Sequence, residues 1–327
     1  MGARGRVRLV VLMLSMVAAT LLAVPPAAVA RPTLPTDFVI ENVMDVSDTV
    51  LAAGMAFLPG EPLLAVAGKR GLVDLYGEDG TRHGRILDIS DKVNHNNDHG
   101  LTGIAFHPDF DRADPATRLL YLWYVWDPDG LADEGSGRRI SRLTSVELAP
   151  VVRDLGAGVQ VQSYEVVPGS EAVVLGGAGM ADPWAPTPAE LEAALGPDPD
   201  CATTGGLCFP GCLNDGDPSN DADCLPTAAC TDGAGYLEDC VAADDTLHAV
   251  GTLRFGPDGA LHAGHGDGAS ASVADPRAFR AGDPDSLNGK VLRIDPATGL
   301  GLPDNPWYSG DPTDNRSRVV AAGLRNP

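Results

Sequence analysis

The sequence predicts an all-β fold of repeated four-stranded antiparallel blades, on two observations. Short apolar runs alternate with turn residues from Ala53 onward, with few helical patterns between them, and strands at such spacing are typical of a sandwich, a barrel or a propeller. One phrase also recurs, as GMAFLPG from residue 54, GIAFHPDF from 103 and TLRFGPDG from 252. Each copy is a strand that runs into a proline-containing turn, which favours repeated blades over a single sandwich.

The stretch from residue 54 to 90 predicts one complete blade. It reads GMAFLPGEPLLAVAGKRGLVDLYGEDGTRHGRILDIS, which gives four candidate strands separated by Gly, Pro, Asp and Lys-Arg-Gly breaks. Similar alternation resumes at GIAFHP, RLLYLWYVW and RRISRLTSVEL, and again at GTLRFGPDGALHAGHGD and GKVLRIDP. We therefore expect blades over residues 31–176 and 246–327.

The N-terminus predicts an export signal over residues 1–30. Three arginines lie within the first eight residues, an apolar run extends from Leu9 to Val24, and Ala28-Val29-Ala30 fits a signal-peptidase site. A membrane anchor is the alternative, but the run is short for a bilayer and prolines follow it directly. We expect a secreted or periplasmic protein without a membrane anchor.

The charge of the chain argues against two kinds of partner. The formal net charge is -22, and an acidic surface repels nucleic acid and anionic membranes. The charge is uneven, because no Lys or Arg occurs from Asp154 to Leu253 while residues 181–245 carry fourteen acids. This shift in composition predicts a separate acidic insert over residues 177–245.

All six cysteines fall inside this insert. In an exported protein an even, clustered set predicts disulfides, here three bridges with fifteen possible connectivities. A zinc site is the alternative, but no histidine lies among the cysteines and their spacings match no paired C-x-x-C pattern. The cysteines are Cys201, Cys208, Cys212, Cys224, Cys230 and Cys240.

The insert also contains a candidate calcium site in the string NDGDPSNDADC. Its side chains supply hard oxygen ligands of the type that Ca²⁺ takes. The string is not an EF-hand, since no Gly stands sixth from its first acid and no Glu stands twelfth. A solvated acidic loop is the alternative interpretation. The candidate ligands are Asp215, Asp217, Asn220, Asp221 and Asp223.

A candidate catalytic pair lies in DTLHAVGTLRFGPDGALHAGHGDG. The Gly-Pro-Asp-Gly segment at 256–259 suits a tight turn, so Thr252–Phe255 and Ala260–Asp267 are expected to pair as a hairpin. His248 precedes one strand and Asp267 ends the other, so the carboxylate could fix the imidazole tautomer, as a general base needs. The alternative is that His248 caps a loop and Asp267 satisfies backbone groups.

Two further pairs of histidines are weaker candidates. In HNNDHG, His95 and His99 stand four apart as in some zinc proteases, but that chemistry needs a helix, and paired Asn followed by Gly favours a loop. His262 and His265 stand three apart on a predicted strand and therefore point to opposite faces.

Five strings carry a resemblance to a known family: HGLTGIAFHPDF, HAVGTLRFGPDGALHAGHGDG, DSLNGKVLRIDP, DNPWY and GLRNP. They occur in the order in which the glucose/sorbosone dehydrogenase family carries similar motifs, and the chain resembles that family over roughly residues 37–176 and 246–327. Its best-known members are soluble PQQ-dependent aldose sugar dehydrogenases, and hedgehog-interacting-protein-like relatives share similar motifs. The resemblance implies a six-bladed β-propeller with PQQ and Ca²⁺ in a central pocket.

The resemblance also implies roles for individual residues. His248 matches the family's catalytic histidine, which takes the proton of an anomeric hydroxyl while hydride moves to the quinone. Asp267 matches the carboxylate that orients this histidine. Arg325 and Asn326 match residues that contact the quinone, where a guanidinium stabilises developing negative charge. Asp98 stands where the dehydrogenases often place a Gln near the cofactor.

These observations lead us to expect an exported PQQ-dependent oxidoreductase that converts an aldose sugar to a lactone and passes electrons to an unidentified acceptor. One alternative is a non-catalytic extracellular propeller that binds a protein or glycan partner through the cysteine-rich insert. Another is a lactonase-like metal hydrolase. The sequence stops at Pro327 inside GLRNP, and about four blades remain once the insert is set aside, so we expect a propeller that is incomplete at its C-terminus.

Overall fold

The computed structural model describes residues 51–127, 139–177, 230, 236–243, 245–271 and 275–327, with short pieces between 37 and 49. It divides into two units, Met1–Asn42 and Val43–Pro327, and every element below belongs to the second. The predicted export signal and the predicted calcium ligands lie outside the described residues, as do four of the cysteines: Cys201, Cys208, Cys212 and Cys224.

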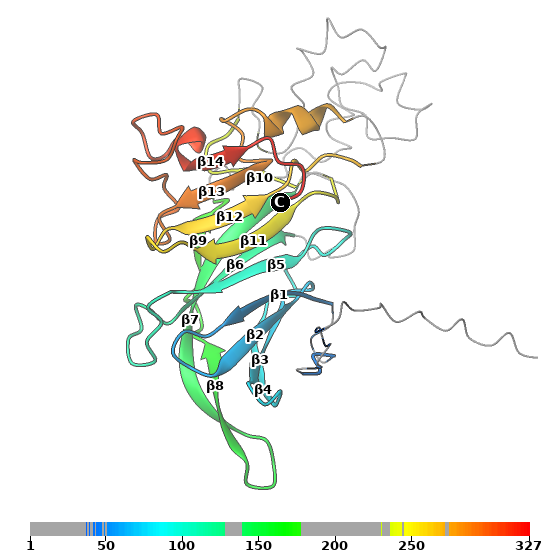
Figure 1. Ribbon diagram of the computed structural model, residues 1–327, viewed down its shortest axis with the longest axis vertical. Coiled ribbons are helices and arrows are strands. Elements are labelled where there is room, and N and C mark those ends of the chain that lie inside the picture. The colour runs from blue at the N-terminus through cyan, green and yellow to red at the C-terminus, as the bar shows by residue number, and fades with distance from the viewer. Residues whose placement is uncertain are drawn as a thin grey trace, which may run out of the picture. The chain divides into compact units, whose positions relative to one another are not determined.

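The described part of the second unit is all-β, as predicted, and its strands form three antiparallel sheets (Figure 1). The first sheet has the order β1-β2-β3-β4 and the third has the order β11-β12-β13-β14. Each strand of these sheets pairs with its neighbour in sequence. The first sheet contains β1 (Ala52–Phe57), β2 (Leu63–Gly68), β3 (Leu72–Gly77) and β4 (Arg82–Asp88); the third contains β11 (Val250–Phe255), β12 (Leu261–His265), β13 (Lys290–Ile294) and β14 (Val319–Ala322).

The middle sheet departs from a simple four-stranded blade. Its main path has the order β10-β7-β6-β5, and two further strands, β8 and β9, also pair with β7. Strand β7 reaches this number of partners because it is 15 residues long. The strands are β5 (Leu101–Phe106), β6 (Leu119–Trp126), β7 (Ile140–Asp154), β8 (Gln160–Val166), β9 (Ala172–Leu175) and β10 (Val241–Ala242), and β10 lies inside the acidic segment predicted from the sequence.

The first strand of each sheet carries the recurring phrase, and these three strands lie side by side. Strand β5 contacts both β1 and β11. Each of the three also has a register shift at its beginning, between Ala52 and Gly54, between Leu101 and Gly103, and between Val250 and Leu253. A shared irregularity at a shared position supports the interpretation that the sheets are copies of one unit.

Glycine at these shifts permits the close approach of the strands. A Cβ atom added at Gly54 would lie 2.6 Å from the Thr102 carbonyl oxygen, and one added at Gly103 would lie 3.0 Å from the Gly251 oxygen. The Thr102 hydroxyl also donates a hydrogen bond to the Val250 carbonyl oxygen at 3.1 Å. Backbone therefore meets backbone along both sides of β5.

Two hydrophobic cores lie between the sheets. Strand β6 reads LLYLWYVW and is buried on both faces, which explains its unbroken apolar sequence. Leu120, Leu122 and Tyr124 pack into the core shared with the first sheet. The alternate residues, among them Tyr121 and Trp123, pack into the core shared with the third sheet.

The end of the predicted insert is attached to the middle sheet. Cys230 and Cys240 form a disulfide, which confirms disulfide formation for this pair. The Asp239 carboxylate accepts the backbone N–H groups of Gly176 at 2.8 Å and Gly177 at 3.1 Å. The chain therefore returns from the insert beside the point at which it leaves β9. Among the helices of the described part, none is long and apolar enough to cross a membrane.

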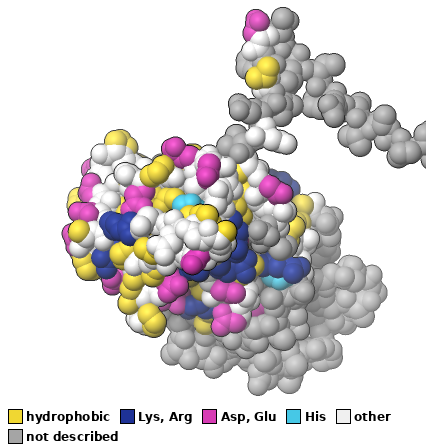
Figure 2. Space-filling view, turned by 90° about the horizontal axis from the view of Figure 1, so that it is seen from below, with side chains coloured by type: hydrophobic (Ala, Val, Ile, Leu, Met, Phe, Trp, Pro, Cys, Tyr) yellow, Lys and Arg dark blue, Asp and Glu magenta, His cyan; other side chains and the backbone are white. Residues whose placement is uncertain are grey.

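Charged side chains of both signs are interspersed on the face shown in Figure 2. At exposed and partly exposed positions of the described chain, side chains of opposite sign form ion pairs, such as that of Arg293 with Asp258 at 2.7 Å and that of Arg118 with Glu147 at 2.9 Å. Ion pairs at such positions contribute little stability, about 0–1 kcal/mol each. The cores between the sheets, rather than these pairs, hold the fold together.

The loop between β4 and β5 is held by buried polar side chains. His99 is fully buried, and its Nδ1 lies 2.7 Å from Asn94 Oδ1 while its Nε2 lies 2.7 Å from the Asp245 carbonyl oxygen. Burial lowers the pKa of His99 from 6.5 to about 4, and the carbonyl of Asp245 opposes this shift only in part. Both ring nitrogens face acceptor oxygens, so only one of them donates in the neutral ring that burial favours.

We expect Gly54→Ala to destabilise the protein by about 1–3 kcal/mol, because its Cβ would push β1 away from β5. Urea unfolding of the full chain measures the change. Gly282→Ala is the matched control, since its Cβ would meet nothing closer than the Phe279 carbonyl oxygen at 3.5 Å. Equal stabilities of the two variants would show that the close contact at Gly54 is unimportant.

We expect His99 to make the protein less stable as the pH falls. The unfolded chain binds a proton at His99 below about pH 6.5, whereas the folded chain binds it only near pH 4, so stability is lost between these values. At about 1.4 kcal/mol per pH unit, the loss from this group between pH 7.5 and pH 5 is roughly 2 kcal/mol. Urea unfolding at both pH values should show a smaller loss in His99→Gln, and an equal loss in both proteins would contradict this assignment.

Candidate active site

The hairpin predicted around residues 256–259 is present. Strands β11 and β12 pair antiparallel, with Val250 opposite His265. The Gly259 N–H donates to the Gly256 carbonyl oxygen at 3.0 Å and closes the turn. His248 precedes β11 by two residues and Asp267 follows β12 by two residues, so both lie at the end of the hairpin opposite the turn.

His248 and Asp267 form a buried pair. His248 Nδ1 lies 3.0 Å from Asp267 Oδ1, and the two residues are only 4% and 5% exposed. Asp267 Oδ1 also accepts the Ala269 N–H at 2.9 Å. A carboxylate facing Nδ1 places the ring proton there and leaves the lone pair on Nε2. In the part of the chain that is described, Nε2 has no hydrogen-bond partner, which is the state that a general base requires.

The backbone of His248 adopts a left-handed conformation, with φ of 54°. This region is uncommon for residues other than glycine, and such outliers concentrate at functional sites. The N–H of His248 donates to Asp98 Oδ2 at 2.9 Å, and its carbonyl oxygen accepts the Gly268 N–H at 3.0 Å. The residue is thus held at both its backbone polar groups.

Buried cationic side chains support the segment that carries Asp267. Arg280 Nε donates to the Asp267 carbonyl oxygen at 2.7 Å, and its Nη2 donates to the Gly268 carbonyl oxygen at 3.0 Å. Lys290 Nζ in turn donates to the carbonyl oxygen of Arg280 at 3.0 Å. Burial lowers the pKa of Lys290 to about 8, with the charge of Asp283 acting in the opposite direction. Arg280 lies on the short 3-10 helix η2 (Pro276–Ala281).

The GLRNP segment lies against this end of the hairpin. The Asp267 N–H donates to the Arg325 carbonyl oxygen at 2.9 Å. Glycine is required at position 266, since a Cβ there would lie 2.6 Å from the Arg325 oxygen and 2.2 Å from the His248 oxygen. The Arg325 side chain is exposed and forms no hydrogen bond or ion pair with any described residue. The predicted quinone contacts therefore lie beside the His248–Asp267 pair.

Asp98 links the remaining predicted residues. Besides the His248 N–H, its Oδ2 is approached by Asn326 Nδ2 at 3.5 Å, which is the limit of a hydrogen bond. The structure thus brings together Asp98, His248, Asp267, Arg325 and Asn326. Their catalytic and cofactor-binding roles remain predictions.

Several features of this arrangement were missed from the sequence. The supporting roles of Arg280 and Lys290 depend on contacts to backbone carbonyl groups, for which composition carries no signal. Lys69, directly after β2, is a third cation near the site. Partial burial lowers its pKa, while the charge of Asp98 acts in the opposite direction. The sequence pattern at Lys69-Arg70-Gly71 indicates only a turn.

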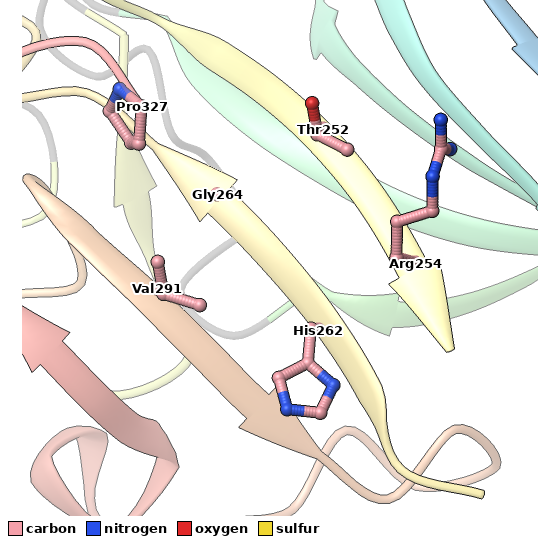
Figure 3. Close-up of a pocket in the computed structure, with 6 residues that line it drawn as sticks. All are labelled: Thr252, Arg254, His262, Gly264, Val291 and Pro327. Atoms are coloured by element: carbon pink, nitrogen blue, oxygen red, sulfur yellow. The ribbon is translucent and has the colours of Figure 1, made fainter. Parts of the chain in front are cut away.

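A cavity of about 210 Å³ lies on the outer face of the same hairpin (Figure 3). The His248–Asp267 pair is not part of its lining, so this cavity is separate from the candidate site. Its walls come from β11, β12, β13 and the C-terminal segment, through Thr252, Arg254, His262, Gly264, Val291 and Pro327. His262 lines this outer face and His265 is buried, which confirms that they point to opposite faces.

The described residues contain no cluster of three or more His, Cys, Asp or Glu side chains that could hold a metal ion. Residues 95–99 form a loop and not a helix, as predicted. The calcium site predicted in the insert lies outside the described residues and stays a prediction.

The chain is similar to solved structures of sugar dehydrogenases at low sequence identity. An oxidoreductase of Thermus thermophilus described as a glucose dehydrogenase is 21% identical, with a TM-score of 0.44 over 88% of this chain and 54% of that chain. The soluble aldose sugar dehydrogenase of Escherichia coli in its apo form is 15% identical, with a TM-score of 0.44 over 88% of this chain and 54% of that one. The chain thus spans about half the length of these structures. No curated protein matches the sequence.

A family model covers the part of the chain that carries the candidate site. It matches residues 229–327, a segment that includes His248, Asp267, Arg325 and Asn326. The model is described as Glucose / Sorbosone dehydrogenase, and the resemblance to this family that the motifs predicted is thereby confirmed.

Proposed function

We propose that this protein is a PQQ-dependent dehydrogenase that oxidises the anomeric hydroxyl of an aldose sugar to a lactone. The observation that carries the proposal is the buried His248–Asp267 pair with a free Nε2, in a segment that matches a sugar dehydrogenase family. The site that the motifs predict also has Arg325 and Asn326 beside the pair. The blade-like sheets support the six-bladed propeller that the resemblance implies.

The residues at the site fit a quinone that carries carboxylates. Arg325 offers an exposed guanidinium without a partner in the described part of the chain, and Asn326 offers an amide next to it. Lys69 adds a cation near Asp98. We assign Arg325 and Asn326 to hold PQQ, with Asp98 at the edge of the same site. No step is assigned to Ca²⁺, because its donor set is not among the described residues.

The chemistry assigned to the chain is a proton transfer. PQQ, when bound, supplies a two-electron acceptor for the hydride that leaves the anomeric carbon. His248 Nε2 takes the proton of the anomeric hydroxyl, so that carbon and oxygen form the carbonyl group of the lactone. Asp267 keeps the Nδ1 proton in place and stabilises the imidazolium that results. Turnover then requires an external electron acceptor.

The proposal extends to an oxidising compartment. The Cys230–Cys240 disulfide is of the kind that persists in secreted and periplasmic proteins. This agrees with the export signal predicted at residues 1–30. The acidic insert, which returns to the body beside β9 through Asp239, is the candidate for a structural calcium or a partner site.

Reconstitution of the full-length protein with PQQ and Ca²⁺ tests the function directly. We expect the absorbance of the oxidised quinone to bleach when an aldose from a panel is added. Binding of PQQ without bleaching by any aldose would retain the fold and reject the substrate class. The absence of PQQ binding would favour the alternative of a non-catalytic propeller that binds a partner.

His248→Ala should lower turnover by about 10²–10⁴-fold, because a positioned general base contributes this much. Binding of PQQ, followed by its absorbance, should be unchanged. His262→Ala is the matched control, since this histidine lies on the outer face of the same hairpin. Unchanged turnover in His248→Ala would reject the mechanism.

Asp267→Asn should lower kcat by about 10–10²-fold, because a neutral amide no longer stabilises the imidazolium and allows the wrong tautomer. The comparison is with Asp258→Asn, which replaces an exposed carboxylate in the turn of the same hairpin. Steady-state kinetics at saturating aldose measure the kcat of both variants. If the two variants have equal kcat values, Asp267 does not assist His248.

A further inference from the structure

The loop between the first and middle sheets is joined to the segment before β11 by four hydrogen bonds. Together they cover residues 97–99 of the loop and 245–248 of the segment. They are Asp98 N to Thr246 O at 2.8 Å, Asn97 Nδ2 to Thr246 Oγ1 at 2.7 Å, His99 Nε2 with Asp245 O at 2.7 Å, and His248 N to Asp98 Oδ2 at 2.9 Å.

Only one of these bonds reaches His248 itself. The Asp98 carboxylate accepts the N–H of a residue whose φ is 54°. A residue other than glycine in this region is disfavoured by about 1–2 kcal/mol, so the conformation needs specific contacts to persist. A hydrogen bond from an N–H group to a carboxylate is charge-assisted and about twice as strong as one between neutral groups.

The backbone conformation decides where the imidazole lies. Asp267 holds Nδ1, but it can do so only if the Cα–Cβ bond of His248 already points toward it. The left-handed turn at His248 provides that direction, and the Gly268 N–H fixes the other side of the same residue. Asp98 is therefore the side chain that holds the backbone of His248, the candidate base, in its left-handed conformation.

We propose that Asp98 is a positioning residue for His248, whose carboxylate holds the left-handed backbone of the histidine so that Nδ1 meets Asp267 and Nε2 stays free. The catalytic consequence rests on the proposed function, whereas the structural contact does not. Asp98 acts here through His248, and its second oxygen, Oδ1, has no hydrogen bond to a described residue. That oxygen remains available to a ligand.

The contact is tested first without any cofactor, by NMR of the full chain labelled with ¹⁵N-histidine. The chain has seven histidines, and His248→Gln assigns the amide signal of His248. We expect Asp98→Ala to speed hydrogen exchange of this amide by at least about 10-fold, since it loses its acceptor. Asp91→Ala, which removes an exposed carboxylate from the same loop, should leave it unchanged.

Asp98→Asn keeps an acceptor oxygen at this position, and it is the variant to measure if Asp98→Ala does not fold. We expect it to retain protection of the His248 amide within about 3-fold of the wild type, and to move the proton shift of this amide because a carbonyl acceptor replaces a carboxylate. The other histidine amides away from the loop should keep their shifts. A His248 amide that is unaffected in both variants overturns the proposal.

Turnover of the reconstituted full-length protein separates this proposal from the proposed function. We expect Asp98→Ala to lower kcat by at least about 10-fold with KM changed less than about 3-fold, and Asp98→Asn to restore most of kcat. If His248→Ala abolishes turnover while Asp98→Ala keeps the wild-type kcat, the positioning role is wrong. If His248→Ala retains turnover but the amide responds to Asp98, the proposed function fails and the contact stands.

Discussion

The candidate site depends on the close packing of β5 between β1 and β11. Gly54 and Gly103 allow these strands to approach at backbone distance, and the Thr102 hydroxyl donates a hydrogen bond from β5 to β11. Because the strands lie side by side, the loop before β5 and the segment before β11 end at the same place. The Asp98 carboxylate thereby reaches an N–H group 150 positions away in sequence. A side chain at either position that separated the strands would separate the acid from the histidine.

The site is held mainly through its backbone. His248 uses both of its main-chain polar groups, Asp267 uses its N–H with Arg325 and its carbonyl with Arg280, and Gly266 leaves space for the two carbonyl groups that cross it. Such contacts fix the direction of a side chain before any substrate arrives, which is what preorganised catalysis requires. They also explain why the side chains of Arg280 and Lys290 are buried here, since both satisfy backbone carbonyl groups that strand pairing leaves unused.

The sequence predicted the parts of the structure that follow from periodicity and turn chemistry. The four strands of the first sheet, the hairpin at 250–265 and the meeting of His248 with Asp267 are of this kind. The second pairing of β7 with β8 and the two-residue strand β10 could not be predicted, because alternation identifies a strand but not its partners. The left-handed conformation of His248 also could not be predicted from the neighbouring sequence, because the carboxylate that bonds its N–H belongs to the distant Asp98. The acidic insert over residues 177–245 was predicted from composition alone, which gave no indication that β10 would lie within it.

Two buried aspartates show why the partners of a carboxylate, rather than its burial, distinguish the candidate site. Asp74 is bonded by Arg82 and Arg85 and by the Thr49 hydroxyl, which together lower its pKa although burial acts to raise it. The charge of Asp74 is neutralised by these two arginines of the first sheet, so its role is structural. Asp267 is similarly enclosed, yet among the contacts of the described residues Arg280 donates to its backbone carbonyl oxygen, and the side chain that meets its carboxylate is His248. The carboxylate of Asp267 is therefore directed to Nδ1 of the His248 ring, where it fixes the orientation of the imidazole.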